Sequence, residues 1–405
     1  MKSKRKICII TQAHLCCNPR VLKEALTLSK FGYDVSVVTS GYSKHFFQSD
    51  LSLIENHSIK MVYVSDLSKK DLHSFSDRVL KKVGTLLVKY LNIETALALG
   101  YGLFRYYETC KLVNANLYIC HQELGTYIGN KLCRLNYKVA FDIEDWYSKD
   151  LLQKAQKERP LKLLQKAEST ALKNGIFCST TSNILAKKLA NTYSCELPHT
   201  IYNVFESQNK LTKEQKEYFN PLKLFWFSQT IGPGRGLEQF LNLSKSFKST
   251  LELHLLGNID ISYREHLKLL MPKQHHLYFH GIVNEQKLAE KIASFDVGLA
   301  LELTVPVSRN YTITNKFFQY IQSGLPVIVS ETEGQNEVFD RFKPGFKLSQ
   351  NPTNKETSEL ENWLSNPIEL QSARKRAIEA AHFYNWEKES KKFIHLVKRA
   401  LDIER

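Results

Sequence analysis

The sequence predicts an α/β protein with two doubly wound, Rossmann-like domains that face one cleft. A chain of 405 residues is too long for one ordinary core. Short apolar segments typical of strands alternate with helical segments, which is the pattern of parallel sheets covered by helices. This alternation restarts after a polar, lysine-rich stretch. We therefore expect an N-terminal domain over 1–205, a linker over 206–221, a C-terminal domain over 222–385, and a last helix within 386–405 that packs back on the first domain.

The N-terminal half opens with a strand–helix–strand unit. An apolar run over 6–11 predicts the first strand, a helical pattern follows over 21–30, and 34–39 predicts the second strand. Such a unit has a right-handed crossover and begins a doubly wound sheet. Later strands of this sheet are expected at 116–121, 139–142, 175–182 and 199–204, with a helix over 183–192.

The C-terminal half repeats this organisation. Strands are expected at 222–227, 253–257, 277–281 and 296–301, and a charged amphipathic helix over 386–401 ends the chain. The most informative segment is 314–330. Thr314 can cap a short helix, Gly324 can end it, and the following Val-Ile-Val run predicts a buried strand. The N-terminus of such a helix suits a diphosphate, because unpaired N–H groups and a partial positive charge gather there.

Composition limits the classes of function. A formal net charge of +15 requires partners of opposite sign, and nucleic acid, an anionic membrane surface and nucleoside diphosphates all qualify. No RNA-binding aromatic motif or helix-turn-helix is present, so no nucleic-acid partner is expected. The eight cysteines form no Cys-x-x-Cys pair and no zinc-type cluster, which favours reduced thiols. The first apolar run is too short for a signal peptide, and we expect a cytoplasmic protein.

Residues 77–93 form an amphipathic pattern with an apolar stripe flanked by basic residues. The pattern is typical of a helix that lies on an anionic membrane. A helix packed on its own sheet gives the same pattern, so both interpretations stay open. A peripheral position at the inner face of the cell membrane is therefore one expected location.

Three motifs resemble family 4 retaining glycosyltransferases, which have the GT-B fold and use nucleotide sugars. The first is the run 315–320, Asn-Lys-Phe-Phe-Gln-Tyr, followed by Gly-Leu-Pro-Val at 324–327. The second is Asn-Pro-Arg-Val-Leu-Lys-Glu-Ala at 18–25, and the third is Arg-Gly-Leu at 235–237. The resemblance covers nearly the whole chain.

The resemblance implies a donor site in the C-terminal domain. Arg235, in a glycine-rich loop, would clamp the donor diphosphate and stabilise the leaving group. The expected donor-binding residues are Gly234, Arg235, Gly236, Asn310, Tyr311, Thr314, Asn315, Lys316 and Gln319. Two glutamates usual in the family are replaced by Tyr311 and Gln319, and Gln229 replaces a further arginine. Gln319 can still accept a hydrogen bond from ribose hydroxyls.

The N-terminal domain would hold the acceptor. Glu144 replaces a histidine that faces the transferred sugar in relatives, and it is the expected catalytic residue together with Arg235. The acceptor-binding candidates are His14, Asn18, Arg20, His121, Glu123 and Asp145. Helix capping explains Asn18 equally well, and acidic residues such as Asp145 are also common at helix starts.

No Asp-x-Asp motif ends a strand, so we expect no metal and no cofactor beyond the nucleotide-sugar co-substrate. The expected activity is transfer of a hexose, with retention, from a nucleoside-diphosphate sugar to a glycan or lipid-linked acceptor in bacterial surface polysaccharide synthesis. Two alternatives remain. One is a nucleotide-sugar epimerase, and the other is a non-catalytic sugar- or partner-binding module, which the missing glutamates favour.

Overall fold

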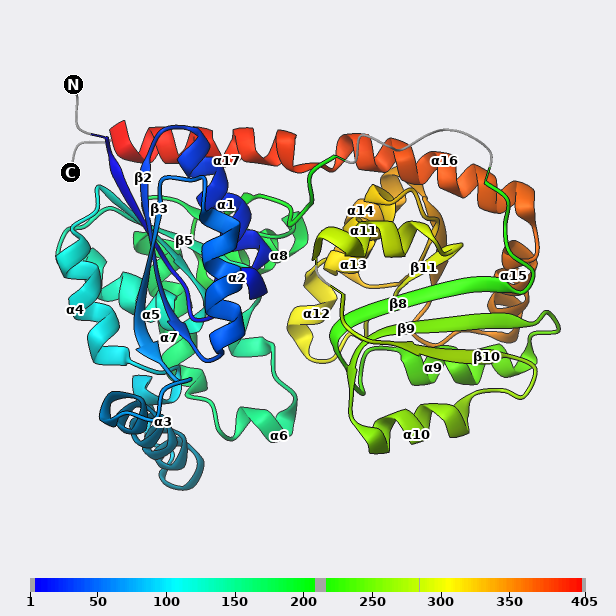
Figure 1. Ribbon diagram of the computed structural model, residues 1–405, viewed down its shortest axis with the longest axis horizontal. Coiled ribbons are helices and arrows are strands. Elements are labelled where there is room, and N and C mark those ends of the chain that lie inside the picture. Colours follow the sequence, from blue (N-terminus) through cyan, green and yellow to red (C-terminus); the bar gives the residue numbers. More distant parts are fainter. Residues whose placement is uncertain (1–3, 208–215, 284, 403–405) are drawn as a thin grey trace. The chain divides into compact units, whose positions relative to one another are not determined.

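The computed structural model describes residues 4–207, 216–283 and 285–402, so residues 208–215, half of the expected linker, lie outside the described residues. The chain divides into two compact units (Figure 1). The first contains Met1–Ile201 and Ser390–Arg405, and the second contains Tyr202–Glu389.

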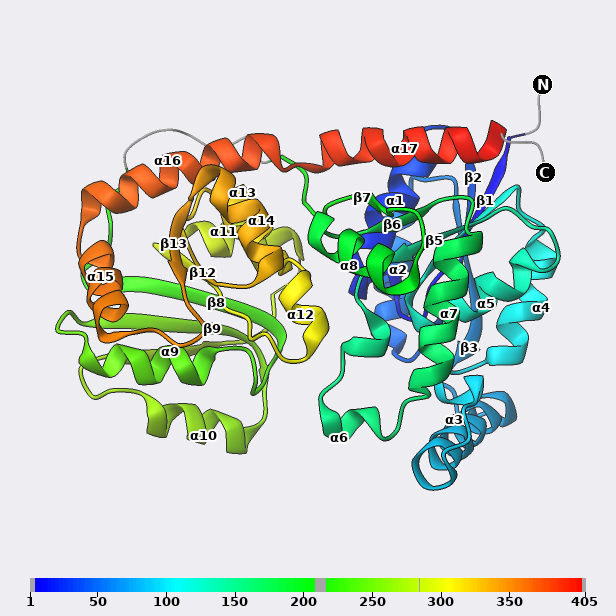
Figure 2. The same cartoon turned by 180° about the vertical axis from the view of Figure 1, so that it is seen from behind.

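The first unit is a parallel, doubly wound sheet with helices on both faces (Figures 1 and 2), which confirms the predicted fold class. In spatial order its strands are β3 (Ile59–Asp66), β2 (Asp34–Gly41), β1 (Lys6–Ile10), β4 (Leu117–His121), β5 (Val139–Ile143), β6 (Cys178–Thr180) and β7 (His199–Thr200). Strand β7 is shorter than the predicted 199–204 because pairing with β6 ends at Thr200.

The helices of this unit connect successive strands. They are α1 (Pro19–Lys30), α2 (Lys44–Ile54), α3 (Leu72–Leu91), α4 (Leu103–Val113), α5 (Gln122–Cys133), α6 (Gln153–Gln156), α7 (Leu161–Asn174) and α8 (Asn183–Tyr193), with short 3-10 turns at Leu15–Cys17, Ala96–Ala98 and Tyr147–Lys149. Helix α1 begins two residues earlier than predicted, because the Asn18 side chain accepts from Val21 N and Pro19 occupies the first turn.

The second unit is also a parallel, doubly wound sheet. Its strands in spatial order are β10 (His276–His280), β9 (Leu251–Ile259), β8 (Leu222–Ile231), β11 (Val297–Ala300), β12 (Val327–Ser330) and β13 (Gly345–Leu348). Strand β8 extends beyond the predicted residue 227, since pairing with β9 resumes at Thr230 after an irregularity in the register.

The helices of the second unit are α9 (Leu237–Leu243), α10 (Ile261–Leu270), α11 (Glu285–Ala293), α12 (Val307–Tyr311), α13 (Asn315–Gln322), α14 (Glu333–Phe342), α15 (Asn354–Leu364) and α16 (Pro367–Phe383), with a 3-10 turn at Ser244–Ser246. The last helix, α17 (Trp386–Asp402), belongs to the first unit from Ser390 onward. There Lys138 Nζ donates to the carbonyl of Leu401 at 2.9 Å.

The segment 314–330 has the structure predicted for it. Helix α13 buries Phe317, Phe318 and Ile321, Gly324 has a φ of 68°, and the buried strand β12 follows between β11 and β13. In each unit the carboxyl ends of the parallel strands meet at one edge, which is where open α/β sheets bind ligands. Most of the candidate site residues follow β4 and β5 in the first unit and β8 and β11 in the second.

Candidate functional site

The loop between β8 and α9 presents Arg235. Gly234 and Gly236 flank this arginine with φ values of 77° and 81°, a left-handed backbone that strongly favours glycine. The guanidinium of Arg309, from α12, donates from Nη1 to the carbonyl of Gly234 at 2.6 Å. The hydrogen bond from Arg309 to the carbonyl of Gly234 therefore joins this loop to α12.

Arg235 and Lys316 share one carboxylate, that of Glu302. Nη1 of Arg235 lies 2.9 Å from Oε1 and 3.2 Å from Oε2 of Glu302. Nζ of Lys316 lies 3.8 Å from the same Oε1 and stands over the ring of Trp226, 4.8 Å from its centroid. One negative charge thus faces two positive charges, and the surplus favours an anionic ligand.

The ammonium of Lys316 is almost fully buried. Burial lowers the pKa of Lys316 to about 8; Glu302 opposes this shift, while Arg235 and Arg309 add to it. A bound anion would favour the charged form of Lys316, so anion binding and protonation of this residue are coupled.

Helix α13 begins beside these cations. Thr314 occupies the N-cap position, but its side chain makes no capping hydrogen bond. The exposed Asn315 accepts a hydrogen bond from Asn203 at 3.0 Å. The first-turn N–H groups of α13, with Arg235 and Lys316, provide the type of donors that bind a diphosphate.

The other predicted donor residues differ in what they contact. Asn310 exchanges two hydrogen bonds with Glu333 at the start of α14, at 3.0 and 3.2 Å, so its amide is engaged within the protein. Tyr311 is half-buried at the end of α12. Gln319, one turn after Asn315 on α13, is half-buried, and its side chain has no hydrogen-bond partner among the described residues. Gln319 is therefore available to a ligand.

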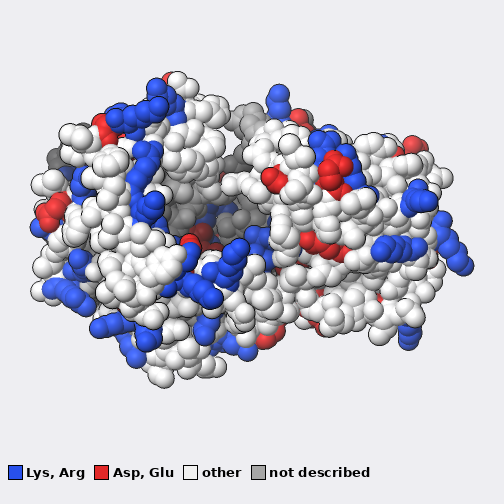
Figure 3. Space-filling model, turned by 90° about the horizontal axis from the view of Figure 1, so that it is seen from below, with Lys and Arg blue, Asp and Glu red and all other residues white. Residues whose placement is uncertain are grey.

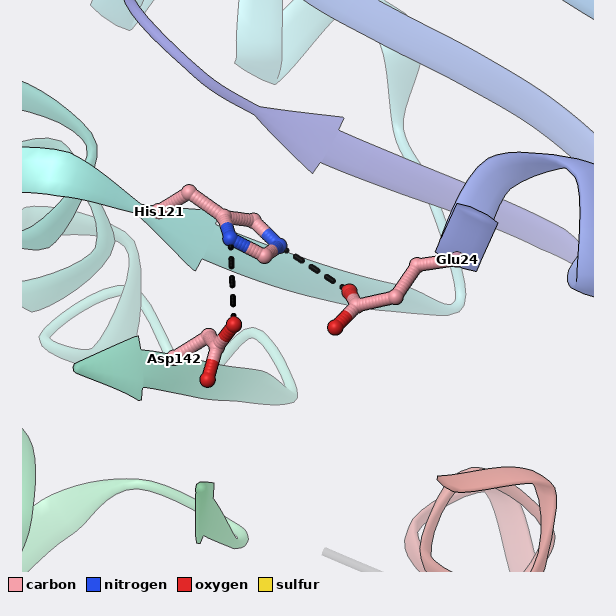
Figure 4. Close-up of side chains that lie close together, drawn as sticks. All are labelled: Glu24, His121 and Asp142. Atoms are coloured by element: carbon pink, nitrogen blue, oxygen red, sulfur yellow. Dashed lines mark hydrogen bonds and ion pairs between the residues drawn. The ribbon is translucent and has the colours of Figure 1, made fainter. Parts of the chain in front are cut away.

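The first unit contains a buried network of charged side chains at the ends of β4 and β5 (Figure 4). His121 Nε2 lies 3.0 Å from Glu24 Oε2, and its Nδ1 lies 3.3 Å from Asp142 Oδ2 and 3.1 Å from Glu144 Oε1. Arg20 binds Asp142 through Nε and, at 2.8 Å, through Nη2. Its Nη1 donates to the carbonyl of Ile201 at 2.7 Å.

The charges in this network compensate one another. Burial alone would lower the pKa of His121, but the Glu24 carboxylate and its neighbours raise it to about 10. The guanidinium of Arg20 holds the pKa of Asp142 below its ordinary value, against the opposing effect of burial. Burial raises the pKa of Glu24. His121 is consequently an imidazolium at neutral pH, bound between carboxylates.

Glu24, His121 and Asp142 are the side chains in the described residues that most resemble a metal-binding group, with one ligand atom from each within 4.8 Å of the others. Their hydrogen bonds argue against that use. Both ring nitrogens of His121 contact carboxylates, and Arg20 supplies a positive charge beside Asp142. The geometry fits an internal ion-pair network better than a cation site.

Glu144 connects the network to solvent. Its side chain keeps 18% of its surface exposed, whereas those of Glu24 and His121 are almost completely buried. Asp145 follows it and is half-buried. A carboxylate that contacts His121 at the end of β5 can bind sugar hydroxyls or accept a proton.

Three predicted acceptor residues are engaged inside the protein. His14 is buried, contacts Asp50 at 2.8 Å through Nδ1, and accepts from the Tyr42 N–H through Nε2. Asn18 caps α1. Arg20 is fully buried in the network described above. Within the described residues their polar groups bind other parts of the protein, and contact of these three residues with an acceptor stays a prediction.

Glu123 lies in the first turn of α5 and pairs with Arg159 at 2.9 Å. Burial raises the pKa of Glu123 to about 7. Among the described residues this carboxylate forms no hydrogen bond or ion pair with Glu144 or His121, so it lies outside the His121 network.

Sequence reasoning missed Glu302, Arg309 and the burial of Glu24. Glu302 comes two residues after β11 and could have been noticed, because ligand-facing side chains follow the carboxyl ends of parallel strands. Arg309 and Glu24 gave no such signal.

No family model matches the sequence, and no curated protein matches it. Solved structures match nearly the whole chain. Sucrose-phosphate synthase from Thermosynechococcus elongatus has 13% identity and a TM-score of 0.69, with 98% of this chain and 99% of that chain covered. Anabaena Alr3699/HepE, in complex with UDP and glucose, has 11% identity and a TM-score of 0.67, with 98% of this chain and 100% of that chain covered. A putative UDP-N-acetylglucosamine 2-epimerase from Listeria monocytogenes has 13% identity and a TM-score of 0.58, with 99% of this chain and 97% of that chain covered.

These similarities establish the fold, which is the two-domain α/β fold of GT-B glycosyltransferases. The epimerase shares this fold at similar identity, so the fold alone does not separate transfer from epimerisation.

Proposed function

We propose that the protein is a glycosyltransferase that moves a hexose from a nucleoside-diphosphate sugar to a glycan or lipid-linked acceptor. The observation that carries the proposal is the cluster of Arg235 and Lys316 beside the N-terminus of α13, with Glu302 as their shared counter-charge. The cluster carries a positive surplus and lies where sheets of this kind bind phosphates.

The leaving group of the reaction is a nucleoside diphosphate, and the second unit would stabilise it. Arg235 offers a planar guanidinium for two phosphate oxygens, and Lys316 adds a point charge. Removal of one such hydrogen-bond donor from a protein typically costs about 2–4 kcal/mol of transition-state stabilisation. We propose that these groups suffice without a metal ion. Gln319 would accept a hydrogen bond from the ribose.

The first unit would contribute Glu144. Its carboxylate, held by His121, would bind the transferred sugar or accept a proton from the acceptor hydroxyl. Retention of configuration rests on the resemblance of the motifs at 18–25, 235–237 and 315–327 to retaining enzymes. A function in bacterial surface polysaccharide synthesis is part of the same proposal, as is a position at the cytoplasmic face of the membrane.

Helix α3 supports contact with an anionic membrane. Most of the predicted apolar stripe of this 20-residue helix faces solvent: Leu87 is half-buried, but Val79, Leu80, Val83, Leu86 and Tyr90 are exposed by 37% to 69%. The same helix also packs on its own unit through the buried Gly84 and Val88, so the two interpretations hold for different faces of α3. None of the helices in the described part of the chain has the length and hydropathy that crossing a bilayer requires.

The charge near α3 suits an anionic surface. Residues 69–91 contain six Lys or Arg and two acidic residues, of which Asp77 is buried against Arg105 and Asp71 caps the helix. On the face seen in Figure 3, basic side chains stand over the first unit among many uncharged ones. Each basic side chain near an anionic membrane contributes about 1 kcal/mol.

Replacing Val79, Val83 and Leu86 together with serine tests this contact. We expect the variant to lose most of its partition to vesicles containing an anionic phospholipid. The control is Leu112→Ser, an equally apolar and 85% exposed position on α4, which should partition like the wild type. Equal partition of both variants would refute the membrane contact.

The catalytic proposal is tested by incubation with nucleotide sugars and candidate acceptors. A transferase releases nucleoside diphosphate and forms a glycosylated product. An epimerase changes the sugar while it stays on the nucleotide, and a non-catalytic module binds without turnover. Net release of nucleoside diphosphate that depends on the acceptor is the expected result.

A further inference from the structure

Glu302 is a buried carboxylate whose backbone is fixed on both sides. Its N–H donates to Ser330 Oγ at 3.0 Å, and its carbonyl accepts from Gln350 Nε2 at 3.2 Å. Only 6% of the residue is exposed. A buried side chain on a backbone held at both its N–H and its carbonyl can orient the cations that bind it.

The first effect of Glu302 concerns Arg235. Both carboxylate oxygens contact the same nitrogen, Nη1, at 2.9 and 3.2 Å. Within the described residues, Nε and Nη2 of Arg235 have no hydrogen-bond partner. The remaining donors of the guanidinium are thereby left for a ligand, in the fork geometry that matches a phosphate.

The second effect concerns Lys316. In the described part of the chain, the charged and ring groups that act on its buried ammonium are Glu302, Arg235, Arg309 and the ring of Trp226. Glu302 is the only anion among them. Without it, a buried ammonium near two guanidinium groups would release its proton at a lower pH.

We propose that Glu302 is a positioning residue of the donor site, which keeps Lys316 charged and orients Arg235 so that both contact the donor diphosphate. The inference rests on the proposed function, because it assigns the diphosphate as the ligand. Glu302 itself contacts the two cations and not the reacting atoms.

Calorimetric titration with UDP-glucose between pH 6 and 9 tests the inference, because the diphosphate of this probe keeps its charge over that range. In the wild type, affinity should be constant at low pH and should fall as pH rises through about 8, where Lys316 loses its proton. In Glu302→Gln the fall should begin at a lower pH. A midpoint lower by one unit makes binding up to about tenfold weaker at pH 9 and changes it by less than about twofold at pH 6.

Two controls assign the effect. Glu302→Asp keeps the charge and should retain most of the wild-type pH dependence. Lys316→Met should bind more weakly and should lack the alkaline fall. If Glu302→Gln binds UDP-glucose with the same pH midpoint as the wild type, Glu302 does not keep Lys316 charged and the inference is wrong.

A second measurement separates this inference from the proposed function. Carbon NMR of proteins labelled at the lysine Cε reports the protonation of Lys316 without ligand, and the Lys316→Met spectrum identifies its signal. The midpoint should be lower in Glu302→Gln than in the wild type. A lowered midpoint in a protein that binds no nucleotide sugar would refute the donor site alone. Donor binding with an unchanged midpoint would refute the positioning by Glu302 alone.

Discussion

Nδ1 of His121 lies 3.1 Å from Oε1 of Glu144, and this contact joins a buried ion-pair network to a carboxylate that solvent reaches. The contacts of His121 with this network explain how the side chain of Glu144 keeps one orientation at the end of β5. Nε2 of His121 contacts Glu24, so the imidazole ring cannot rotate without breaking this second contact. Glu144 is therefore oriented by residues that do not themselves reach the surface.

Glu144→Gln should abolish most turnover while leaving donor affinity nearly unchanged. The amide keeps the shape of the side chain but cannot accept a proton, and removal of a positioned general base typically costs 10²- to 10⁴-fold in rate. Steady-state kinetics and calorimetric donor binding on the same preparation measure the two effects. A variant with wild-type kcat would show that Glu144 has no part in the chemistry.

His121→Gln should destabilise the first unit most strongly below neutral pH. The pKa of His121 is raised in the folded protein to about 10 from an ordinary value of 6.5. Its stabilising contribution is therefore complete below about pH 6.5 and is lost as pH rises through about 10. Breaking a buried ion pair costs about 3–5 kcal/mol. Urea unfolding at pH 6, 8 and 10 should show this loss shrinking with pH.

The exposed His45 on α2 is the matched control for that experiment. His45→Gln should stay within about 0.5 kcal/mol of the wild type at each pH, as surface substitutions usually do. A pH-independent loss for His121→Gln would mean that packing, and not charge, accounts for the destabilisation.

Substitutions of Gln319 test whether the donor site binds a nucleotide. Gln319→Glu should change nucleotide affinity by about tenfold or less, because a carboxylate can also accept a ribose hydrogen bond. Gln319→Leu should weaken binding more, because the ribose would lose its partner. Calorimetric binding of UDP to all three proteins measures this, and equal affinity of the leucine variant would remove Gln319 from the site.

Chelation should leave turnover intact. The donor cluster supplies positive charge from Arg235 and Lys316, and the most metal-like group among the described residues is engaged with Arg20. Initial rates with and without EDTA measure this. Loss of activity with EDTA, followed by recovery with magnesium or manganese, would contradict metal-independent transfer.

The fold could be predicted because its signals are local. Apolar runs of strand length, a helix cap at Asn18 and a glycine stop at Gly324 each depend on a few neighbouring residues. Helix α13 and strand β12 lie where such signals place them. Strand ends were less accurate, because pairing with a neighbouring strand decides where β7 and β8 stop.

The functional side chains were harder to predict because their partners are distant in sequence. Arg20 matches the family motif at the start of a helix, but its burial depends on Asp142, 122 positions away. Glu302 meets Arg235 from 67 positions away. Sequence spacing could indicate which loops gather at the sheet edge, but not which charges neutralise one another there.

In the proposed donor site, Arg235 and its neighbours bind the diphosphate of a nucleotide sugar. The most direct test is thermal unfolding of the wild type and Arg235→Ala against a panel of nucleotide sugars. A ligand at a hundredfold its dissociation constant stabilises the folded state by about 2.7 kcal/mol, so at least one donor should raise the Tm of the wild type. The same donor should give a clearly smaller shift with Arg235→Ala. If no nucleotide or nucleotide sugar changes the wild-type Tm, or if both proteins shift equally, the donor site is not where we place it.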